Sequence, residues 1–121
     1  MKLSEAIRLG SMLRPQGFGA YTRDGRSCAL GAAREAIGLI LGWPGEWVVI
    51  LSKRQKCPVC CVADVATVSL RHLVIDRLFE TIVLLNDEHH WTREQIADFI
   101  ESQVERKQGN ADAVEQVLLS A

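Results

Sequence analysis

The segment LNDEHHWTREQIADFIES places the tightest constraint on the fold, because it contains a complete signal for the start of a helix. Thr92 is followed three residues later by Gln95, which is the spacing of a capping box, and Trp91 and Ile96 flank the cap as a hydrophobic staple. The pattern predicts a helix from Thr92 to near Gly109, whose buried face carries Ile96, Phe99, Ile100 and Val104.

Three other stretches have the apolar spacing of helices. Residues 3–13 form one of them, with Ser4 as a candidate N-cap and Pro15 as a stop. Residues 28–41 are apolar apart from one polar stripe, and their alanines predict the close approach of a neighbouring helix. The run from 62 to 85 contains few helix breakers and predicts the longest helix.

Two segments leave room for a small β ribbon. The run EWVVILSK, which contains residues 47–51, is rich in β-branched side chains and fits either a short strand or a helix. A strand there would pair with residues 18–22, in a glycine-rich stretch that turns at Asp24 and Gly25. We therefore expect a mainly α fold of about five helices in one compact domain over residues 1–121, with this ribbon as an optional element.

Charge and hydropathy argue against several function classes. The 14 Lys and Arg residues oppose 15 acidic residues, and the net charge of −1 creates no global positive field for nucleic acid or an anionic membrane, although a local patch remains open. No apolar run approaches the roughly 18 residues that a membrane span needs. Glu5 and Arg8 interrupt any signal-peptide core, so we expect a cytoplasmic protein with reduced cysteines.

The cluster CPVCC holds three of the four cysteines and is a candidate zinc site. Cys57 and Cys60 have the spacing of half a tetrahedral site, and Cys61 or His72 would supply further ligands, with Asp76 one helical turn after the histidine. The alternative is that the three cysteines fill a turn as small buried side chains, because a reduced cysteine is among the most buried residue types. Cys28 is expected to be a small buried sulfur as well.

The segment from Asn86 to His90 is a second candidate site. Two carboxylates and two imidazoles fall within residues 87–90, a composition that suits metal binding or acid and base catalysis. The alternative is a solvated turn between two helices, in which the acidic residues precede the positive end of the second helix.

The segments SCALGAAREAIG and LNDEHHWTREQIADFIES together resemble small uncharacterised bacterial proteins of phage and mobile elements, including integron gene cassettes. The resemblance covers about a third of the chain and implies a cytoplasmic accessory protein, with no activity or cofactor attached to it. It directs attention to four residues as candidate ligand-binding or partner-binding positions, namely Asn86, Asp87, His89 and Trp91.

Three functional hypotheses follow. The first is a non-enzymatic interaction or adaptor module that binds a protein partner or a second copy of itself, with tryptophans at turns as candidate anchors: Trp43, Trp47 and Trp91. The second is a regulatory protein stabilised by zinc at the cysteine cluster. The third is a small enzyme that uses the loop from Asp87 to His90.

Overall fold

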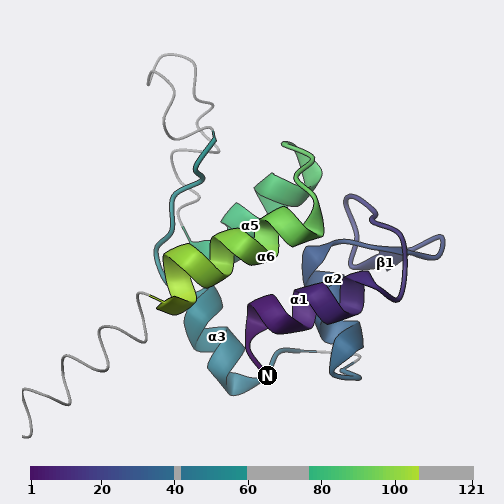
Figure 1. The fold of residues 1–121 in the computed structure, drawn as a ribbon, viewed down its shortest axis with the longest axis horizontal. Coiled ribbons are helices and arrows are strands. Elements are labelled where there is room, and N and C mark those ends of the chain that lie inside the picture. The colour runs from purple at the N-terminus through teal and green to yellow at the C-terminus, as the bar shows by residue number, and fades with distance from the viewer. Residues whose placement is uncertain (40–41, 60–76, 107–121) are drawn as a thin grey trace, which may run out of the picture.

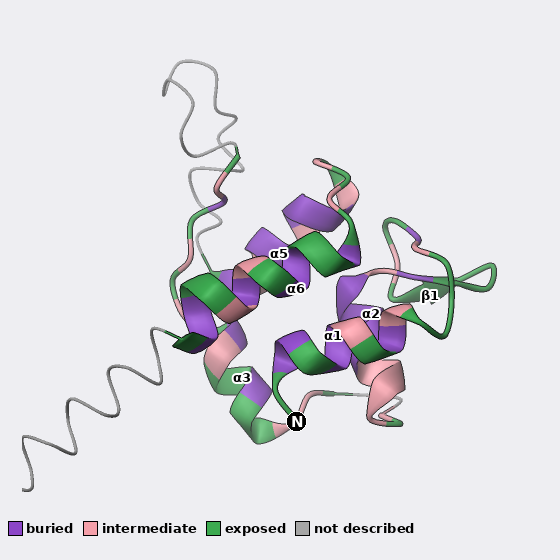
Figure 2. Ribbon diagram, viewed as in Figure 1, coloured by how far each residue is buried: buried purple, intermediate pink, exposed green. Residues whose placement is uncertain are grey.

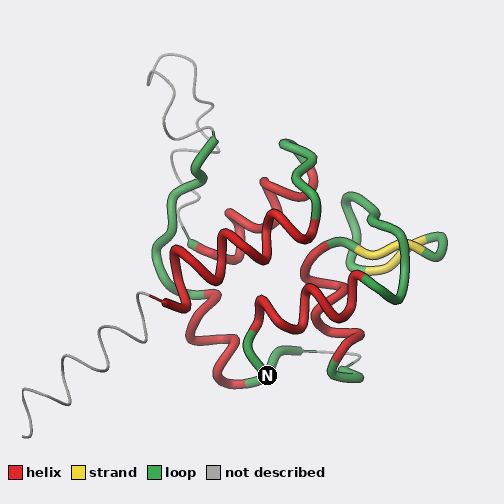
Figure 3. The backbone as a smooth tube through the Cα atoms, in the orientation of Figure 1, coloured by secondary structure: helices red, strands yellow, loops and turns green. Residues whose placement is uncertain are grey.

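The computed structural model describes residues 1–39, 42–59 and 77–106, and the fold in these ranges is mainly α. Five α-helices and one π-helical turn accompany a single two-stranded sheet in the described part of the chain (Figures 1 and 3). The elements in chain order are α1 (Leu3–Ser11), β1 (Thr22–Arg23), β2 (Arg26–Ser27), α2 (Ala29–Ala36), α3 (Gly45–Leu51), α5 (Leu78–Asp87), α6 (Arg93–Ile100) and the π-helical turn η3 (Glu101–Glu105). The predicted fold class is therefore confirmed.

Helix α1 occupies the centre of the arrangement and packs against both α2 and α6. Its contact with α2 is backbone to backbone at Gly10, where a Cβ atom would lie 1.8 Å from the carbonyl oxygen of Ala32. Only a glycine permits this approach, because any side chain there would overlap the neighbouring main chain. The prediction that the small residues of α2 admit a close neighbour is confirmed.

The buried side chains of the described residues form one apolar cluster, which lines the inner faces of the helices (Figure 2). Trp47 is 1% exposed, and its indole N–H donates to the carbonyl oxygen of Met1 over 3.0 Å. Trp43 and Trp91 are partly buried and pack against the same cluster. None of the three tryptophans is therefore an exposed interface anchor.

The start of α6 follows the sequence prediction. The Thr92 hydroxyl accepts from the backbone N–H of Gln95 over 3.1 Å, and the Gln95 side chain accepts from the backbone N–H of Thr92 over 2.9 Å. This reciprocal capping satisfies two donors that the first helical turn leaves unpaired. The predicted buried face is also present, with Ile96, Ile100 and Val104 buried and Phe99 partly buried.

Polar contacts fix α1 against α6 and η3. The buried carboxylate of Glu105 accepts from the backbone N–H and the hydroxyl of Ser4 over 3.1 and 2.8 Å, at the positive end of α1. The guanidinium of Arg8 contacts three carboxylates of the C-terminal helices at 2.6 to 3.1 Å, and these contacts raise the pKa of Arg8. These carboxylates belong to Glu94, Asp98 and Glu101.

Three details of the sequence prediction are wrong. The β ribbon joins β1 to β2 across the turn at Asp24 and Gly25, and residues 47–51 belong to α3, so the helical alternative holds for that segment. Helix α1 begins after Lys2 as N-cap, because the Ser4 hydroxyl is committed to Glu105. It also ends at Ser11, well before Pro15.

Two other predictions fall largely outside the described residues. Of the helix expected over 62–85, the structure describes only the part within α5, and the last short helix expected after Gly109 lies wholly in the undescribed range. Within the three described ranges, no helix is long and apolar enough to cross a membrane.

Candidate functional site

Asn86 is the hub of a buried polar network rather than an exposed polar turn residue. Its side chain is 1% exposed, and its carbonyl oxygen accepts from the backbone N–H of Ala29 over 3.2 Å and from the Gln16 amide over 2.9 Å. Its NH₂ group donates to the carbonyl oxygen of Gly17 over 3.0 Å and to Asp87 over 2.7 Å. Both donors and both acceptor positions of the amide are therefore used within the protein.

The neighbours of Asn86 bind the same stretch of chain. The Asp87 carboxylate accepts from the backbone N–H of Gly19 over 3.0 Å, and the carbonyl oxygen of Trp91 accepts from the Gln16 amide over 2.8 Å. We call residues 14–28 the glycine loop. Three of the four predicted binding residues, Asn86, Asp87 and Trp91, therefore bind one common segment. That segment is the glycine loop of their own chain and not an external ligand.

The two histidines of this turn have separate environments. The Nε2 atom of His89 is buried and has no hydrogen-bond partner among the described residues, while its backbone N–H donates to the carbonyl oxygen of Leu84. His90 adopts a positive φ of 55° and is exposed, and its ring lies 4.7 Å from that of Phe18. The two imidazoles do not form a joint site with Asp87, so the contacts of this turn lend no support to the catalytic-loop alternative.

Arg93 completes the attachment of the glycine loop, and sequence reasoning did not find it. Its guanidinium donates to the carbonyl oxygen and hydroxyl of Ser27 over 3.3 and 2.9 Å, to the carbonyl oxygen of Ser11 over 3.2 Å and to that of Arg14 over 2.7 Å. Burial lowers the pKa of Arg93, and no carboxylate of the described residues pairs with it. One cation thus ties the end of α1 to both ends of the loop.

The attached loop forms one wall of a pocket of about 640 Å³, which we call the loop pocket. The backbone position of Tyr21 in this wall is set by Gly31, where a Cβ atom would lie 1.9 Å from the Tyr21 carbonyl oxygen. The remaining wall comes from α2 and the residues that follow it. The lining residues are Tyr21, Thr22, Gly31, Arg34, Glu35, Gly38 and Leu39.

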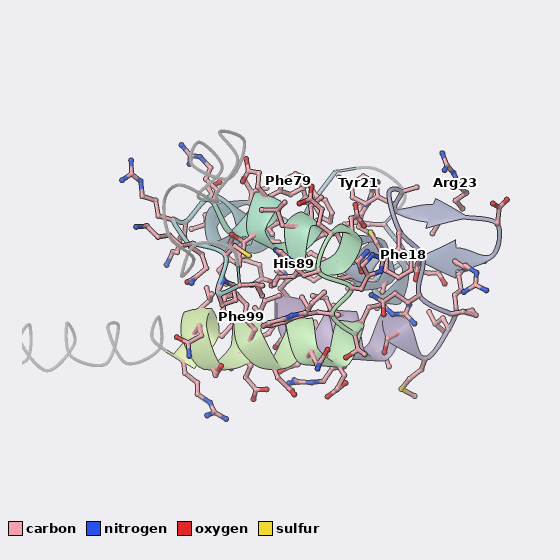
Figure 4. All side chains as sticks on the ribbon, turned by 90° about the horizontal axis from the view of Figure 1, so that it is seen from above. Phe18, Tyr21, Arg23, Phe79, His89 and Phe99 are labelled. Atoms are coloured by element: carbon pink, nitrogen blue, oxygen red, sulfur yellow. The ribbon has the colours of Figure 1, made fainter. Side chains whose placement is uncertain are left out.

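Aromatic rings and charges converge at the loop pocket. The Arg34 guanidinium carbon lies 4.7 Å from the centre of the Tyr21 ring and 5.2 Å from that of Trp43, and the two rings meet edge to face at 5.7 Å. Such contacts favour the cation and restrict its side-chain rotation. Glu35 is paired with Arg14, whose Nε donates to both carboxylate oxygens at 2.8 and 2.9 Å. Tyr21 and Phe79 lie toward the same side of the molecule (Figure 4).

Of the predicted zinc ligands, only Cys57 lies in the described part of the chain. It is 2% exposed and packs in the apolar core cluster, as a small buried side chain would. Cys60, Cys61, His72 and Asp76 lie outside the described residues. Among the described residues, no three His, Cys, Asp or Glu side chains form a group that could hold a metal ion.

Cys28 is a partly buried thiol at the N-cap of α2, and its sulfur accepts from the backbone N–H of Gly31 over 3.4 Å. Burial is the largest cause of a raised pKa at this thiol, so it is protonated at neutral pH. This agrees with the expected small buried sulfur.

Comparison of the chain with protein-family models, curated proteins and solved structures gives no match. The function is therefore argued from the contacts of the glycine loop and of the loop pocket.

Proposed function

We propose that this protein is a non-enzymatic binding module that takes a small organic anion with an apolar ring into the loop pocket. The observation that supports the proposal is the pocket of about 640 Å³ beside the Arg34 guanidinium, which lies against two aromatic rings. This volume lies within the range of roughly 300 to 1,000 Å³ that is usual for small-molecule sites.

The lining chemistry selects the class of ligand. A planar guanidinium suits a carboxylate, sulfonate or phosphate group, because its donors form a fixed fork. Tyr21 is 39% exposed and offers part of its ring to an apolar ligand group, and Leu39 adds apolar surface. Arg14 compensates the charge of Glu35, which reduces the repulsion that this carboxylate would exert on a bound anion.

The glycine loop explains how such a pocket keeps its shape. Asn86 and Arg93 fix the backbone on either side of Tyr21, so the ring is presented from a loop with buried hydrogen-bonded anchors. A wall that is ordered before binding loses less conformational entropy when a ligand arrives. The predicted residues Asn86 and Asp87 therefore act in this proposal as supports of the binding wall and not as ligand contacts.

The test uses 1-anilinonaphthalene-8-sulfonate as the probe, because it carries a sulfonate on an apolar ring system. We expect saturable binding to the folded protein, followed by probe fluorescence. Arg34→Gln should weaken binding about tenfold, since a charge-assisted hydrogen bond contributes on the order of 1.5 to 3 kcal/mol. Tyr21→Ala should weaken it as well, whereas Tyr21→Phe should bind like the wild type.

Two controls separate the pocket from unspecific binding. Lys56→Gln removes one charge from an exposed position that does not line the pocket and should leave the affinity unchanged. N-phenyl-1-naphthylamine, which lacks the sulfonate, should bind more weakly than the anionic probe. Equal affinity for both probes, or equal binding by wild type and Arg34→Gln, would show that the proposal is wrong. Circular dichroism of each variant establishes that it is folded.

A second candidate function is self-association, and one exposed stripe favours it. Leu9, Met12 and Leu13 are 43%, 80% and 57% exposed and follow one another at helical spacing along and beyond α1. Adjacent exposed apolar side chains of this kind are typical of interaction surfaces. Light scattering over a range of concentrations tests it: a dimer that Met12→Lys converts to monomer supports self-association, and a monomer throughout refutes it.

We further infer a cytoplasmic accessory role, which rests on the sequence resemblance to proteins of phage and integron cassettes. A zinc-stabilised form using the cysteine cluster stays a prediction. Elemental analysis of protein purified without added metal tests it, and zinc below about a tenth of an equivalent would refute it.

A further inference from the structure

The turn of the glycine loop places two arginines opposite each other. Asp24 and Gly25 both have positive φ angles, 54° and 73°, as a two-residue hairpin turn of type I′ requires. The strands on either side pair Arg23 directly with Arg26. Directly opposite residues of an antiparallel pair project from the same face with Cβ atoms about 5 Å apart. The hairpin therefore carries both arginine side chains on one face at its exposed end.

This pairing of like charges weakens the hairpin. Neither Arg23 nor Arg26 forms an ion pair within the described residues. Arg26 is oriented by one hydrogen bond, from its guanidinium to the carbonyl oxygen of Gln16 over 3.2 Å. Arg23 projects outward from the ribbon (Figure 4). Both arginines line one cleft, and an anion bound there would offset the repulsion between them.

An exposed aromatic ring lies beside the arginine pair. Phe18 is 46% exposed, and its ring contacts that of His90 at a tilt of 48°. A second cleft, of about 180 Å³, joins the ring to the hairpin. Its lining residues are Gly17, Phe18, Ala20, Arg23, Asp24 and Arg26.

The charge of the whole chain hides a local asymmetry. Residues 1–59 contain nine basic and four acidic side chains, whereas residues 60–121 contain five basic and eleven acidic ones. The net charge of −1 therefore does not describe the part of the chain that carries the hairpin. The local positive patch that the sequence leaves open stays a prediction, and the hairpin is the place where we consider it.

We propose that the hairpin and Phe18 form a binding site for single-stranded nucleic acid. The two guanidinium groups contact backbone phosphates, and a base stacks on the exposed Phe18 ring, as in many single-strand binding surfaces. Asp24 favours this partner over an acidic peptide, because its carboxylate can accept from the ring and exocyclic N–H groups of bases, which acidic side chains lack. The site lies outside the loop pocket and does not depend on the ligand proposed there.

The test is fluorescence anisotropy with a fluorescein-labelled oligouridylate of about 20 nucleotides, at about 50 mM salt and above. We expect salt-dependent binding by the wild type. The double variant Arg23→Gln with Arg26→Gln should bind at least tenfold more weakly than the wild type. The slope of log affinity against log salt should also fall by about 1.4, because each phosphate contact on a single strand contributes about 0.7. Phe18→Ala should weaken binding about tenfold, and Phe18→Tyr should restore it.

The matched control is Lys2→Gln with Lys56→Gln, which removes the same charge from exposed positions outside the cleft lining. This control should bind within about twofold of the wild type, because the change in net charge alone is small. Three results would overturn the proposal: no salt-dependent binding by the wild type, equal loss in the hairpin and control variants, or equally tight binding of polyglutamate. The dye titration of the loop pocket is unaffected by any of them, so failure here is distinguishable from failure there.

Discussion

Two tightly packed regions of this protein are held together in opposite ways. The α1–α2 contact is made by small side chains and by backbone atoms, with the missing side chain of Gly10 allowing the approach to Ala32. The glycine loop is attached through hydrogen bonds from two side chains that lie far away in sequence, Asn86 and Arg93. The first region is fixed by shape, and the second is fixed by polar complementarity.

The difference indicates where binding groups are found. A shape-fixed contact tolerates little change in side-chain volume. It presents no polar or charged group to a ligand, because its side chains are apolar and buried. A polar network keeps a backbone with few apolar contacts in one conformation, provided that all its members are satisfied. The exposed rings and paired arginines of this protein lie on the loop that the network holds, so the network supports the surface on which both proposed sites depend.

The largest effect is expected from breaking the shape-fixed contact. Gly10→Ala would place a Cβ atom 1.8 Å from the carbonyl oxygen of Ala32, so the two helices must separate. We expect the free energy of unfolding to fall by about 3 kcal/mol, at the upper end of the usual cost of overpacking. Urea unfolding measures this change.

Gly45→Ala is the matched control, because nothing lies within 4 Å of the Cβ position at Gly45. It should change the free energy of unfolding by less than about 1 kcal/mol, and in the stabilising direction, because alanine loses less backbone entropy on folding. Equal stability of Gly10→Ala and Gly45→Ala would mean that the α1–α2 approach is looser than described.

A smaller and more local effect is expected from the polar network. Asn86→Ala leaves the backbone N–H of Ala29 and the carbonyl oxygen of Gly17 without a partner, which should lower the free energy of unfolding by about 2 kcal/mol. Amide hydrogen exchange should accelerate at Gly19 and Ala29, while the amides of α1 keep their protection.

The matched control for Asn86→Ala is Gln103→Ala, which removes an amide from an exposed position of η3. It should change the free energy of unfolding by no more than about 0.5 kcal/mol. The loop-pocket proposal predicts a second effect of Asn86→Ala. The affinity for the sulfonate dye should fall, because the variant releases the pocket wall that carries Tyr21. Unchanged exchange at Ala29, whose N–H donates to Asn86, would contradict the role assigned to Asn86.

The sequence predicts the helices and the shape-fixed contact between α1 and α2 well, because their signals are local. The capping box at Thr92 lies within four residues, and the apolar spacing of α1 and the alanines of α2 report directly on buried faces. The segment 47–51 shows the limit of such signals. Its β-branched residues favour a strand, but the buried contacts of Trp47 and Leu51 in the core stabilise a helix instead.

For the polar region, the sequence predicts candidate residues but not their hydrogen-bond partners. Composition points to Asn86 and Asp87, and the resemblance adds Trp91, but their partners lie 57 to 75 residues away, and no local pattern encodes which backbone atoms they meet. Arg93 was missed for the same reason, since an arginine in the first turn of a helix looks like a solvated surface residue. The close contact of Gly31 with Tyr21 likewise depends on two segments meeting in space.

The smallest effect is expected at Cys28, where the glycine loop joins α2. Burial raises the pKa of this thiol in the folded protein, whereas an exposed thiol in the unfolded chain titrates near pH 8.5. The stabilisation from this raised pKa is fully present below about pH 8.5 and is lost as pH rises toward the folded pKa, because the unfolded chain releases its proton first. Cys28→Ser keeps an acceptor at the N-cap and removes this titration. Urea unfolding at pH 7.5, 8.5 and 9.5 measures the free energy of unfolding of both proteins. We expect the wild type to lose more stability than the variant as the pH rises, by less than about 1.4 kcal/mol per pH unit. If the stability of wild type and variant changed equally with pH, Cys28 would be exposed to solvent in the folded protein. The glycine loop would then be packed less tightly against α2 than the structure shows.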